Sequence, residues 1–577
     1  MYKLILILTA LIIANAHADS SWIEQSNVHA RQVMEMNARY NPERVSAQGL
    51  ESYDENIMDL GQGVFERRQQ DARRMIEHLQ QELDKTVEPR VTQDLHILTK
   101  RLQDNLRARQ LHHQLMLPYY NLSEWLYSGF QSLLDKRVDS RRYPAALSRL
   151  KKYTGRQQGF TPIVELAKDR TREAFKNTQL IGPYIVELNQ DRENLTRYIE
   201  GISDLFKTLK LDGWQEEFDL LKKQLLGYDE WIVENVAPRA RASHLLPPEI
   251  YAQNLKDFGV EMDPKDLMRI AQFSFSDIRN EMQSLAKSLA QIHKLPSDDY
   301  IDVIDAFKKD QLDSDRIVDF YQQRMNEIDL IIKQNRLISL PQRETAIRLA
   351  TEAESARIPA PYLDTPQILG NTGQTPEFVL PLNNPNAKEG GALDDFTFAA
   401  VAWTLAAHEV RPGHELQMSS MIEQGVSLAR ALYAFNSANV EGWALYAEAI
   451  MQSYFPPEGQ FFTLQLRLLR AARAFLDPML NLGQITPDEA KQFLITQVGF
   501  SEGMASQEVD RYTFQMPGQA TSYFYGYTRL MALRTETELK LKQDFDQQTY
   551  HDFLIAQGLL PLDLLRQAVL EEFIPAS

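Results

Sequence analysis

The chain has 577 residues, with 62 lysines and arginines against 79 aspartates and glutamates, a formal net charge of −17, and no cysteine. Nucleic acid is not an expected partner, because a phosphate backbone requires a concentrated positive surface and this chain is acidic. The lack of cysteine excludes a disulfide scaffold, a cysteine nucleophile, a thiolate zinc cluster and a lipid anchor on cysteine. With 44% hydrophobic and 24% charged residues, the composition is that of a globular protein long enough to bury a large core.

The first residues have the pattern of a signal peptide. Lys3 supplies a positive charge, residues 4–14 are an apolar run too short to span a bilayer, and Ala16-His17-Ala18 fits an A-x-A cleavage site. We expect residues 1–18 to be removed, the mature chain to begin near Asp19, and the protein to be periplasmic or secreted; an uncleaved anchor helix is the alternative. No later segment reaches about 18 uninterrupted apolar residues, so we expect no membrane span in the mature chain.

Helical periodicity dominates the rest of the chain, which predicts a mainly α fold. Over the first half, apolar residues recur at spacings of three and four among many charges. The segments with this pattern are Glu51–Lys85, Arg90–Met116, Pro144–Tyr153 and Thr161–Lys176. Farther on, Pro264–Ile292 is strongly amphipathic, and Asp263 before Pro264 is typical of a helix N-cap. We expect an N-terminal helical lobe over residues 19–240 and a second region over residues 241–577.

Between Ile358 and Gly391 the composition changes to proline, glycine, asparagine and threonine. One short apolar run here, Phe378–Leu382, can form a strand. One interpretation is an edge strand that pairs with an extended ligand through its backbone. The alternative is a hairpin that packs on the core.

The segment that follows contains the residues best suited to metal binding and acid–base catalysis. An alanine-rich apolar stretch ends in His408-Glu409, and His414 follows a Pro412-Gly413 break. In the zinc peptidase motif H-E-x-x-H, two histidines four residues apart share one helix face and bind one metal, while the glutamate activates water. Here the histidines are six apart, which on an ideal helix places them about 120° out of register. Because proline and glycine break helices, the additional residues can loop out and bring His414 back toward His408.

A third metal ligand is expected on a nearby helix. The segment from Asn436 to Glu448 offers Glu441 and Glu448, seven residues apart and therefore on one helix face. Carboxylates in such an apolar helix are costly unless they are paired or bind a cation. We predict Glu441 as the third ligand. Glu448 is either an outer partner that orients a ligand histidine or a solvated residue.

Together these residues resemble a bacterial family, domain of unknown function 885 (DUF885). The resemblance is carried by His408-Glu409-x-x-Pro412-Gly413-His414 with Gln417, by Glu441–Tyr446, by Pro517–Ala520 with Tyr523 and Arg534, and by the segments Pro248–Tyr251 and Pro264–Leu285. It extends over nearly the whole mature chain. The family is similar to helical gluzincin oligopeptidases, so the resemblance implies a zinc metallopeptidase-like protein of two helical lobes, with a central channel and a small β element beside the zinc helix.

The chain departs from the family at one position. Two consecutive histidines are common after Pro-Gly, whereas here Glu415 follows His414. If the later histidine is the family's ligand, the site in this chain is altered. We favour His414, because it matches the Gly-His of related zinc helices.

The expected roles follow from zinc chemistry. His408, His414 and Glu441 would hold Zn²⁺ with one position open, and Glu409 would be the general base and later the proton donor. The family pattern makes Tyr523 the first candidate for an oxyanion donor, with core packing as the alternative. Roles for Tyr525 and Tyr527 stay open, and Arg534 binds either a substrate carboxylate or a buried acid.

Other features weigh less. His112-His113 is interpreted as a solvated face, and the aromatic residues Tyr119, Tyr120 and Trp125–Phe130 either line a channel or pack in the core. No G-x-S-x-G elbow and no phosphate loop is present, which disfavours a serine hydrolase and a nucleotide-dependent enzyme.

The favoured function is an exported zinc peptidase whose substrate is an oligopeptide. Glu409 supports this choice, because a purely structural metal site has no need of a general base. The alternatives are a non-catalytic periplasmic helical binding protein with a structural metal, and a zinc hydrolase of a non-peptide amide or ester. No oligomeric state is indicated.

Overall fold

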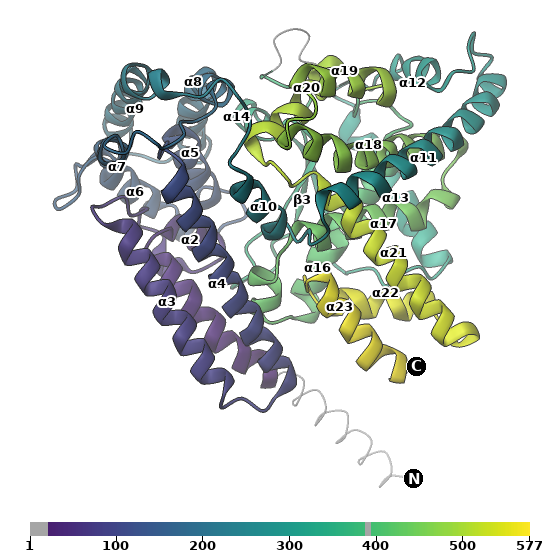
Figure 1. Ribbon diagram of the computed structural model, residues 1–577, viewed down its shortest axis with the longest axis horizontal. Helices are drawn as coiled ribbons and strands as arrows, with labels where there is room; N and C mark the ends of the chain where they lie inside the picture. Colours follow the sequence, from purple (N-terminus) through teal and green to yellow (C-terminus); the bar gives the residue numbers. More distant parts are fainter. Residues whose placement is uncertain (1–20, 387–393, 577) are drawn as a thin grey trace.

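The N-terminal half of the chain is a layered set of helices. The computed structural model describes residues 21–386 and 394–576, so the predicted signal peptide, residues 1–18, lies outside the described residues. Residues 21–38 are helical. They are followed by α2 (Pro42–Ala47), α3 (Val64–Leu83), α4 (Pro89–Leu115), α5 (Leu122–Leu133), α6 (Pro144–Thr154), α7 (Ile163–Ala174), α8 (Ile185–Thr208) and α9 (Gln215–Asn235), which form the left half of Figure 1.

Two hydrophobic clusters hold these helices together. One lies among α5 to α9, with Phe130, Tyr153 and Phe206 fully buried. The other joins residues 21–38, α3 and α4, and also takes in Leu428 and Ala429 from the second half of the chain. The N-terminal helices therefore pack on the rest of the protein through apolar contacts. A division at residue 240 stays a prediction.

The second half contains longer helices and a small sheet. Its first elements are α10 (Pro248–Asp257), α11 (Pro264–His293), α12 (Tyr300–Lys308), α13 (Ile317–Gln334), β1 (Ala346–Leu349), α14 (Glu352–Arg357), β2 (Tyr362–Asp364), β3 (Glu377–Leu380), α15 (Ala402–Leu405), the π-helical turn η4 (Ala406–Val410) and α16 (His414–Gln424). The chain ends with η5 (Ala429–Tyr433), α17 (Ser437–Met451), α18 (Pro457–Asn481), α19 (Pro487–Phe493), η7 (Leu494–Val498), α20 (Glu502–Asp510), η8 (Arg511–Gln515), α21 (Thr521–Leu541), α22 (Gln547–Ala556), α23 (Leu562–Ala568), η10 (Val569–Phe573) and α24 (Ile574–Ala576). Short 3₁₀ turns are η1 (Glu51–Tyr53), η2 (Ser140–Arg142), η3 (Ala237–Arg239), η6 (Gln452–Tyr454) and η9 (Lys542–Asp544). The predicted mainly α fold is confirmed.

Most predicted helices are present, with one correction. The Asp263 carboxylate accepts a hydrogen bond from the Lys265 amide at 2.9 Å and caps α11, as the sequence predicts. The predicted helix over Glu51–Lys85 is wrong in its first third: only a 3₁₀ turn forms there, and α3 begins at Val64. Gly63 directly precedes α3 with a φ of +69°, a left-handed conformation that interrupts a helix and that glycine adopts at little cost.

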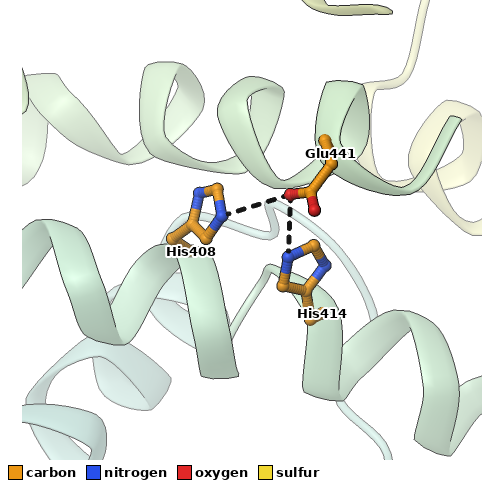
Figure 2. Close-up of side chains that lie close together, drawn as sticks. All are labelled: His408, His414 and Glu441. Carbon is orange, nitrogen blue, oxygen red and sulfur yellow. Dashed lines mark ion pairs between the residues drawn. The ribbon is translucent and has the colours of Figure 1, made fainter. Parts of the chain in front are cut away.

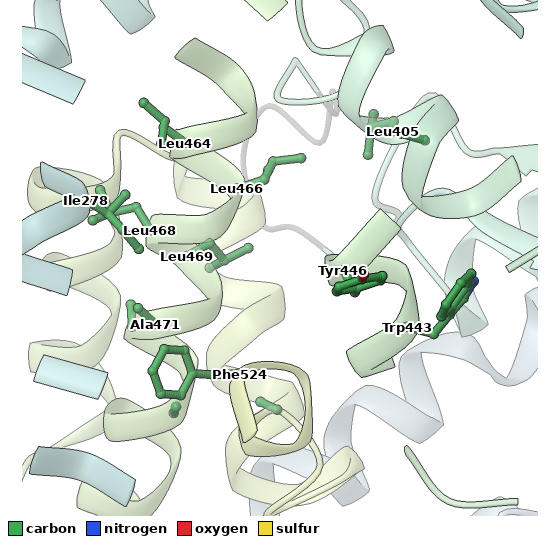
Figure 3. Packing of buried hydrophobic residues seen from close by; sticks show 14 of the residues in the cluster. Ile278, Leu405, Trp443, Tyr446, Leu464, Leu466, Leu468, Leu469, Ala471 and Phe524 are labelled. Atoms are coloured by element: carbon green, nitrogen blue, oxygen red, sulfur yellow. The ribbon is translucent and has the colours of Figure 1, made fainter. Parts of the chain in front are cut away.

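The core of the second half lies between α11 and α18. On α11 the buried residues recur every three or four positions, so one face of the helix is apolar over its whole length. This face packs against the leucines of α18, and Figure 3 shows Ile278 beside Leu468 within the same cluster as Trp443, Tyr446 and Phe524. In the described part of the chain, no helix combines the length and the hydropathy required to cross a bilayer.

The sheet has three strands in the order β1-β3-β2, with β3 parallel to β1 and antiparallel to β2. All four residues of β3 are buried. The edge-strand interpretation of Phe378–Leu382 is therefore wrong, because both sides of β3 already pair with other strands.

Two glycines bring α17 and α21 close together. A Cβ atom on Gly442 of α17 would lie 2.6 Å from the Gly526 carbonyl carbon of α21, and a Cβ on Gly526 would lie 1.9 Å from the Ala438 oxygen. Because only glycine leaves room for this contact, the two helices are in backbone-to-backbone contact. This backbone contact fixes the position of α17, the helix that carries Glu441 and Glu448.

Candidate metal centre

The helix that carries His408 changes its geometry at this residue. α15 continues as a π-helical turn over Ala406–Val410, closed by a 3.0 Å bond from the Arg411 amide to the Ala406 oxygen. The chain then leaves the helix and α16 begins at His414. Residues between the two histidines thus form the predicted break.

Gly413 allows the chain to turn tightly in this break. Its φ is −76°, so it is not chosen for a left-handed conformation. Instead, a Cβ atom at this position would lie 1.8 Å from the His408 carbonyl oxygen and 2.4 Å from the Ala407 oxygen. A side chain would therefore prevent the close approach that returns His414 toward His408.

Side chains hold the break on both sides. The Trp443 indole Nε1 donates to the Pro412 carbonyl at 2.9 Å, and Arg411 Nε donates to the Glu415 carboxylate at 2.7 Å. Arg411 also pairs with Asp329 at 3.0 Å. Glu415 is fully buried and accepts a further 2.6 Å bond from the Ser419 hydroxyl. Glu415 therefore stabilises the start of α16 and is not directed at the histidines.

The structure brings His408, His414 and Glu441 together from three elements (Figure 2). Glu441 Oε2 lies 3.6 Å from His408 Nε2 and 3.3 Å from His414 Nε2, and one ligand atom from each residue falls within 4.8 Å of the others. Among residues 21–386 and 394–576, this is the only group of three or more metal-ligating residue types with such spacing. Two imidazoles and one carboxylate form the ligand set of many catalytic zinc sites.

Glu448 fixes the orientation of the His408 ring. Its Oε1 atom accepts a 2.6 Å hydrogen bond from His408 Nδ1, and Arg470 lies 3.5 Å from the same carboxylate oxygen. With Nδ1 donating, a neutral His408 ring would present the Nε2 lone pair to the cluster, which is the form that binds a metal. The structure thus places Glu448 as an outer partner of His408 and not as a solvated residue.

The cluster is strongly polarised. Burial lowers the pKa of His408, but the carboxylates of Glu441, Glu448 and Glu409 outweigh burial and raise this pKa to about 9. For Glu441, burial is opposed by the two histidine rings, which hold the pKa of its carboxyl well below the usual range. A cation in the cluster would replace the proton of His408, because protons and metals compete for the same lone pairs.

Glu409 lies beside the cluster with a different environment. Its Oε1 atom is 3.9 Å from His408 Nε2, and burial raises the pKa of its carboxyl against the opposing effect of His408 and His414. Within the described residues, no hydrogen bond to the Glu409 carboxylate is formed. A raised pKa and an unengaged carboxylate are properties of a group that accepts and returns a proton.

One unsatisfied carboxylate oxygen supports a cation in this cluster. Glu441 Oε2 is buried and has no hydrogen-bond partner among the described residues, although it faces both histidine Nε2 atoms. A buried carboxylate oxygen without a donor is costly unless a cation binds it. Among the described residues, His414 Nδ1 is buried and has no hydrogen-bond partner. His414 therefore has no carboxylate that orients its ring, unlike His408, whose Nδ1 donates to Glu448. The residues present thus fit a divalent metal.

Tyr523 lies next to the cluster and belongs to an arginine-rich shell. Its ring is parallel to that of His408, with centroids 6.3 Å apart. Its hydroxyl oxygen accepts a 2.7 Å bond from Arg511, so the hydroxyl hydrogen stays available to donate. Burial raises the pKa of Tyr523 although Arg511 opposes the shift, which keeps the phenol protonated.

The arginines of this shell were not predicted from the sequence. The guanidinium groups of Arg470, Arg473 and Arg511 lie 5.9, 4.6 and 5.2 Å from the Tyr523 ring centre. Arg473 is itself held by Glu508 at 2.7 Å. Two arginines three residues apart in the apolar α18 were the available signal, since buried arginines require partners.

The remaining predicted residues lie outside the cluster. The Tyr525 hydroxyl accepts a bond from Arg529, and the Tyr527 ring lies under Arg467. Arg534 pairs with Glu538 at 2.7 Å and donates to the Tyr446 hydroxyl at 3.2 Å. For Arg534 the structure therefore shows an ion pair with an acid.

The chain belongs to the family of bacterial proteins of unknown function DUF885, which matches residues 42–569. Two solved structures share the fold. A candidate lipoprotein of unknown function from Shewanella oneidensis has a TM-score of 0.71 and 18% identity, and covers 95% of this chain and 99% of its own. A candidate lipoprotein from Colwellia psychrerythraea has a TM-score of 0.74 and 15% identity, and covers 96% of this chain and 100% of its own.

A third solved structure, PZ peptidase A with an inhibitor, aligns with a TM-score of 0.24 and 12% identity over 88% of this chain and 97% of its own. A TM-score of this size does not establish a common fold. No curated protein matches the sequence.

Proposed function

We propose that the protein is an exported metal-dependent hydrolase of oligopeptides, with Zn²⁺ as its metal. The observation that carries the proposal is the convergence of His408, His414 and Glu441 with Glu409 alongside. Convergence of three ligands alone would suit a structural metal. Glu409 adds a buried carboxylate whose pKa is raised and which forms no hydrogen bond within the described residues. A structural metal site does not require such a carboxylate.

In this proposal the residues around the metal have different roles. His408, His414 and Glu441 would hold the zinc ion, and two neutral histidines with one carboxylate would leave it enough positive charge to act as a Lewis acid toward water and a scissile carbonyl. Glu448 holds the His408 ring in the binding orientation through its 2.6 Å bond to Nδ1. A peptide is the proposed substrate because the residues from His408 to His414 match DUF885, a family that is similar in architecture to gluzincin oligopeptidases.

The chain's own groups move the protons. Glu409 takes one proton from the attacking water, whose oxygen forms the new bond to the carbonyl carbon. As the C–N bond breaks, Glu409 passes this proton to the departing amine. The Tyr523 hydroxyl donates a hydrogen bond to the carbonyl oxygen while it carries negative charge, and Arg511 holds that hydroxyl in place.

Metal content and turnover test the proposal together. Purified protein should contain about one zinc per chain by elemental analysis and cleave a quenched peptide library, and a chelator should abolish cleavage. His414→Ala should lose the metal, whereas His96→Ala, an exposed histidine of α4, should keep it. Metal content unaffected by loss of His414 would refute the cluster.

Glu409→Gln separates the alternatives. For a hydrolase, this isosteric change should keep the metal and the fold but reduce turnover by at least 10²-fold, which is the usual contribution of general acid–base catalysis. A bound metal with no turnover in the unaltered protein would favour a helical binding protein with a structural metal. Cleavage of amide or ester probes but not of peptides would favour the non-peptide hydrolase.

Export is part of the proposal and rests on residues 1–18. N-terminal sequencing of protein recovered from the periplasm or the medium should find a chain that begins near Asp19. A full-length chain that stays with the membrane would favour the uncleaved anchor.

A further inference from the structure

A large cavity lies where the N-terminal helices meet the second half of the chain. It has a volume of about 1090 Å³ and is lined by residues of α3, α4 and α5 on one side and of α10 and the segment Phe514–Pro517 on the other. Figure 1 shows α10 between the two halves of the molecule. None of His408, His414 and Glu441 lines it, so this cavity is separate from the metal centre.

Most of the cavity lining is apolar. Its large side chains include Leu60, Phe65, Trp125, Ile250, Phe514 and Met516. Trp125 and Met516 are 40% and 41% exposed, and Phe65 stacks on His113 with ring centres 3.6 Å apart. Apolar surface gathered in a concave site is typical of ligand binding.

Four arginines interrupt this apolar lining, and none of them has a carboxylate partner in the described part of the chain: Arg44, Arg68, Arg109 and Arg241. Arg241 donates instead to the Gly182 and His244 carbonyl oxygens. Arg68 of α3 and Arg109 of α4 are the two of these arginines whose pKa values burial lowers most clearly on this side of the cavity. Burial and the nearby charge of Arg68 lower the pKa of Arg109 to about 9. Burial also lowers the pKa of Arg68, whose Nε atom is buried without a hydrogen-bond partner. Two partly buried like charges that act on each other are unfavourable without an anion nearby.

The acids that line the cavity are already engaged elsewhere. Glu43 accepts bonds from the Met58 amide and the Tyr153 hydroxyl. Asp59 pairs with Arg67 at 2.5 Å. Glu187 accepts a bond from the Tyr184 amide at the start of α8. The positive charge of Arg68 and Arg109 is therefore not neutralised by these acids.

We propose that this cavity binds a ligand with an apolar body and a carboxylate, and that Arg68 and Arg109 bind the carboxylate. Guanidinium groups suit this task because their N–H groups form paired hydrogen bonds to both carboxylate oxygens. The apolar body would contact the side chains around Trp125. Both a peptide with apolar residues before its free C-terminus and a fatty acid have this chemistry.

The cavity wall is continuous with the shell of the metal centre. Phe514 and Gln515 end the π-helical turn that begins with Arg511, and Arg511 donates to the Tyr523 hydroxyl. A carboxylate ligand in the cavity would thus contact the segment that positions Tyr523. The site goes beyond the proposed hydrolase, since binding to Arg68 and Arg109 requires no metal.

Calorimetric titration tests this site without turnover. In a Glu409→Gln background, N-acetyl-Leu-Phe with a free carboxylate, the same dipeptide as its C-terminal amide, and decanoate are titrated separately. The free carboxylate should bind at least tenfold more tightly than the amide. Arg68→Gln and Arg109→Gln should each weaken binding at least tenfold, whereas Arg107→Gln, an exposed arginine of the same helix α4, should not.

Tryptophan emission locates the ligand, and thermal melting checks that each variant folds. Binding should change the emission, and this change should be lost in Trp125→Phe. Tight binding of decanoate but not of the dipeptide would support the carboxylate site with an acyl ligand. Equal binding of acid and amide, no binding of either carboxylate, or binding that survives both arginine variants and disappears in His414→Ala would overturn the proposal.

Discussion

Replacing Gly413 with alanine should move His414 away from His408 while leaving both histidines in the sequence. The new Cβ would lie 1.8 Å from the His408 oxygen, whereas real Cβ contacts stay beyond 3.0 Å, so the backbone must shift by at least about 1.2 Å. Metal–ligand distances tolerate only about 0.2 Å. We therefore expect Gly413→Ala to bind metal at least tenfold more weakly and to lose about 1–3 kcal/mol of stability through overpacking.

Competition with a calibrated chelator measures the affinity, and urea unfolding of the metal-free protein measures the stability. Gly227→Ala is the matched control, because Gly227 lies inside α9 with no positive φ, and a Cβ atom added there would meet nothing within 4 Å. This control should be neutral or stabilise the protein by up to about 1 kcal/mol. A Gly413→Ala protein with unchanged metal affinity would refute the role of the tight turn.

Three further changes test other parts of the structure. Glu448→Gln should weaken metal binding about 10–100-fold in the same chelator assay, because His408 loses its carboxylate partner. Asp477→Asn should flatten the pH dependence of the free energy of unfolding. Burial raises the pKa of Asp477 from 3.8 to about 7, so between these pH values the folded state keeps a proton that the unfolded state releases. In the unaltered protein, the free energy of unfolding should therefore fall by up to about 4 kcal/mol as the pH rises across this range. Gly526→Ala should destabilise the protein by about 1–3 kcal/mol in urea, because its Cβ would lie 1.9 Å from the Ala438 oxygen and force α17 away from α21.

Each of these changes has a contrary outcome. Glu502→Gln, whose parent side chain is 72% exposed, should leave metal affinity unchanged, and an equal loss in both glutamate variants would remove the special role of Glu448. If the unaltered protein and Asp477→Asn show the same slope of unfolding free energy between pH 4 and 7, Asp477 does not hold a proton in that range. Unchanged stability of Gly526→Ala would mean that α17 and α21 adjust freely.

The convergence of His408, His414 and Glu441 was predictable from the sequence, because these residue types at this spacing suit a shared metal. Pro412-Gly413 between the histidines indicated a break, and the structure contains one. The π-helical turn at His408 was not predictable, because it depends on tertiary contacts such as the bond from Trp443 to Pro412. The buried arginine shell of Tyr523 joins residues distant in sequence, and no local pattern brings such residues together.

The two wrong predictions, an edge strand and a helix that begins too early, also depend on contacts or backbone conformations that a local pattern does not contain. An apolar run such as Phe378–Leu380 predicts a strand but not its neighbours, and β1 and β2 pair with it from both sides. Periodicity over Glu51–Lys85 predicted a helix too early, because the left-handed Gly63 outweighs the apolar spacing before Val64.

The bond from Trp443 to the Pro412 carbonyl has a consequence for exchange kinetics. One helix, α17, supplies Glu441, orients His408 through Glu448, and holds the loop before His414 through Trp443. Because all three groups depend on the same helix, they open together or not at all. For a metal held in this cluster, the slow step of release would be separation of α17 from α21, so the half-life of the bound ion would follow local unfolding of the core and be nearly independent of chelator concentration.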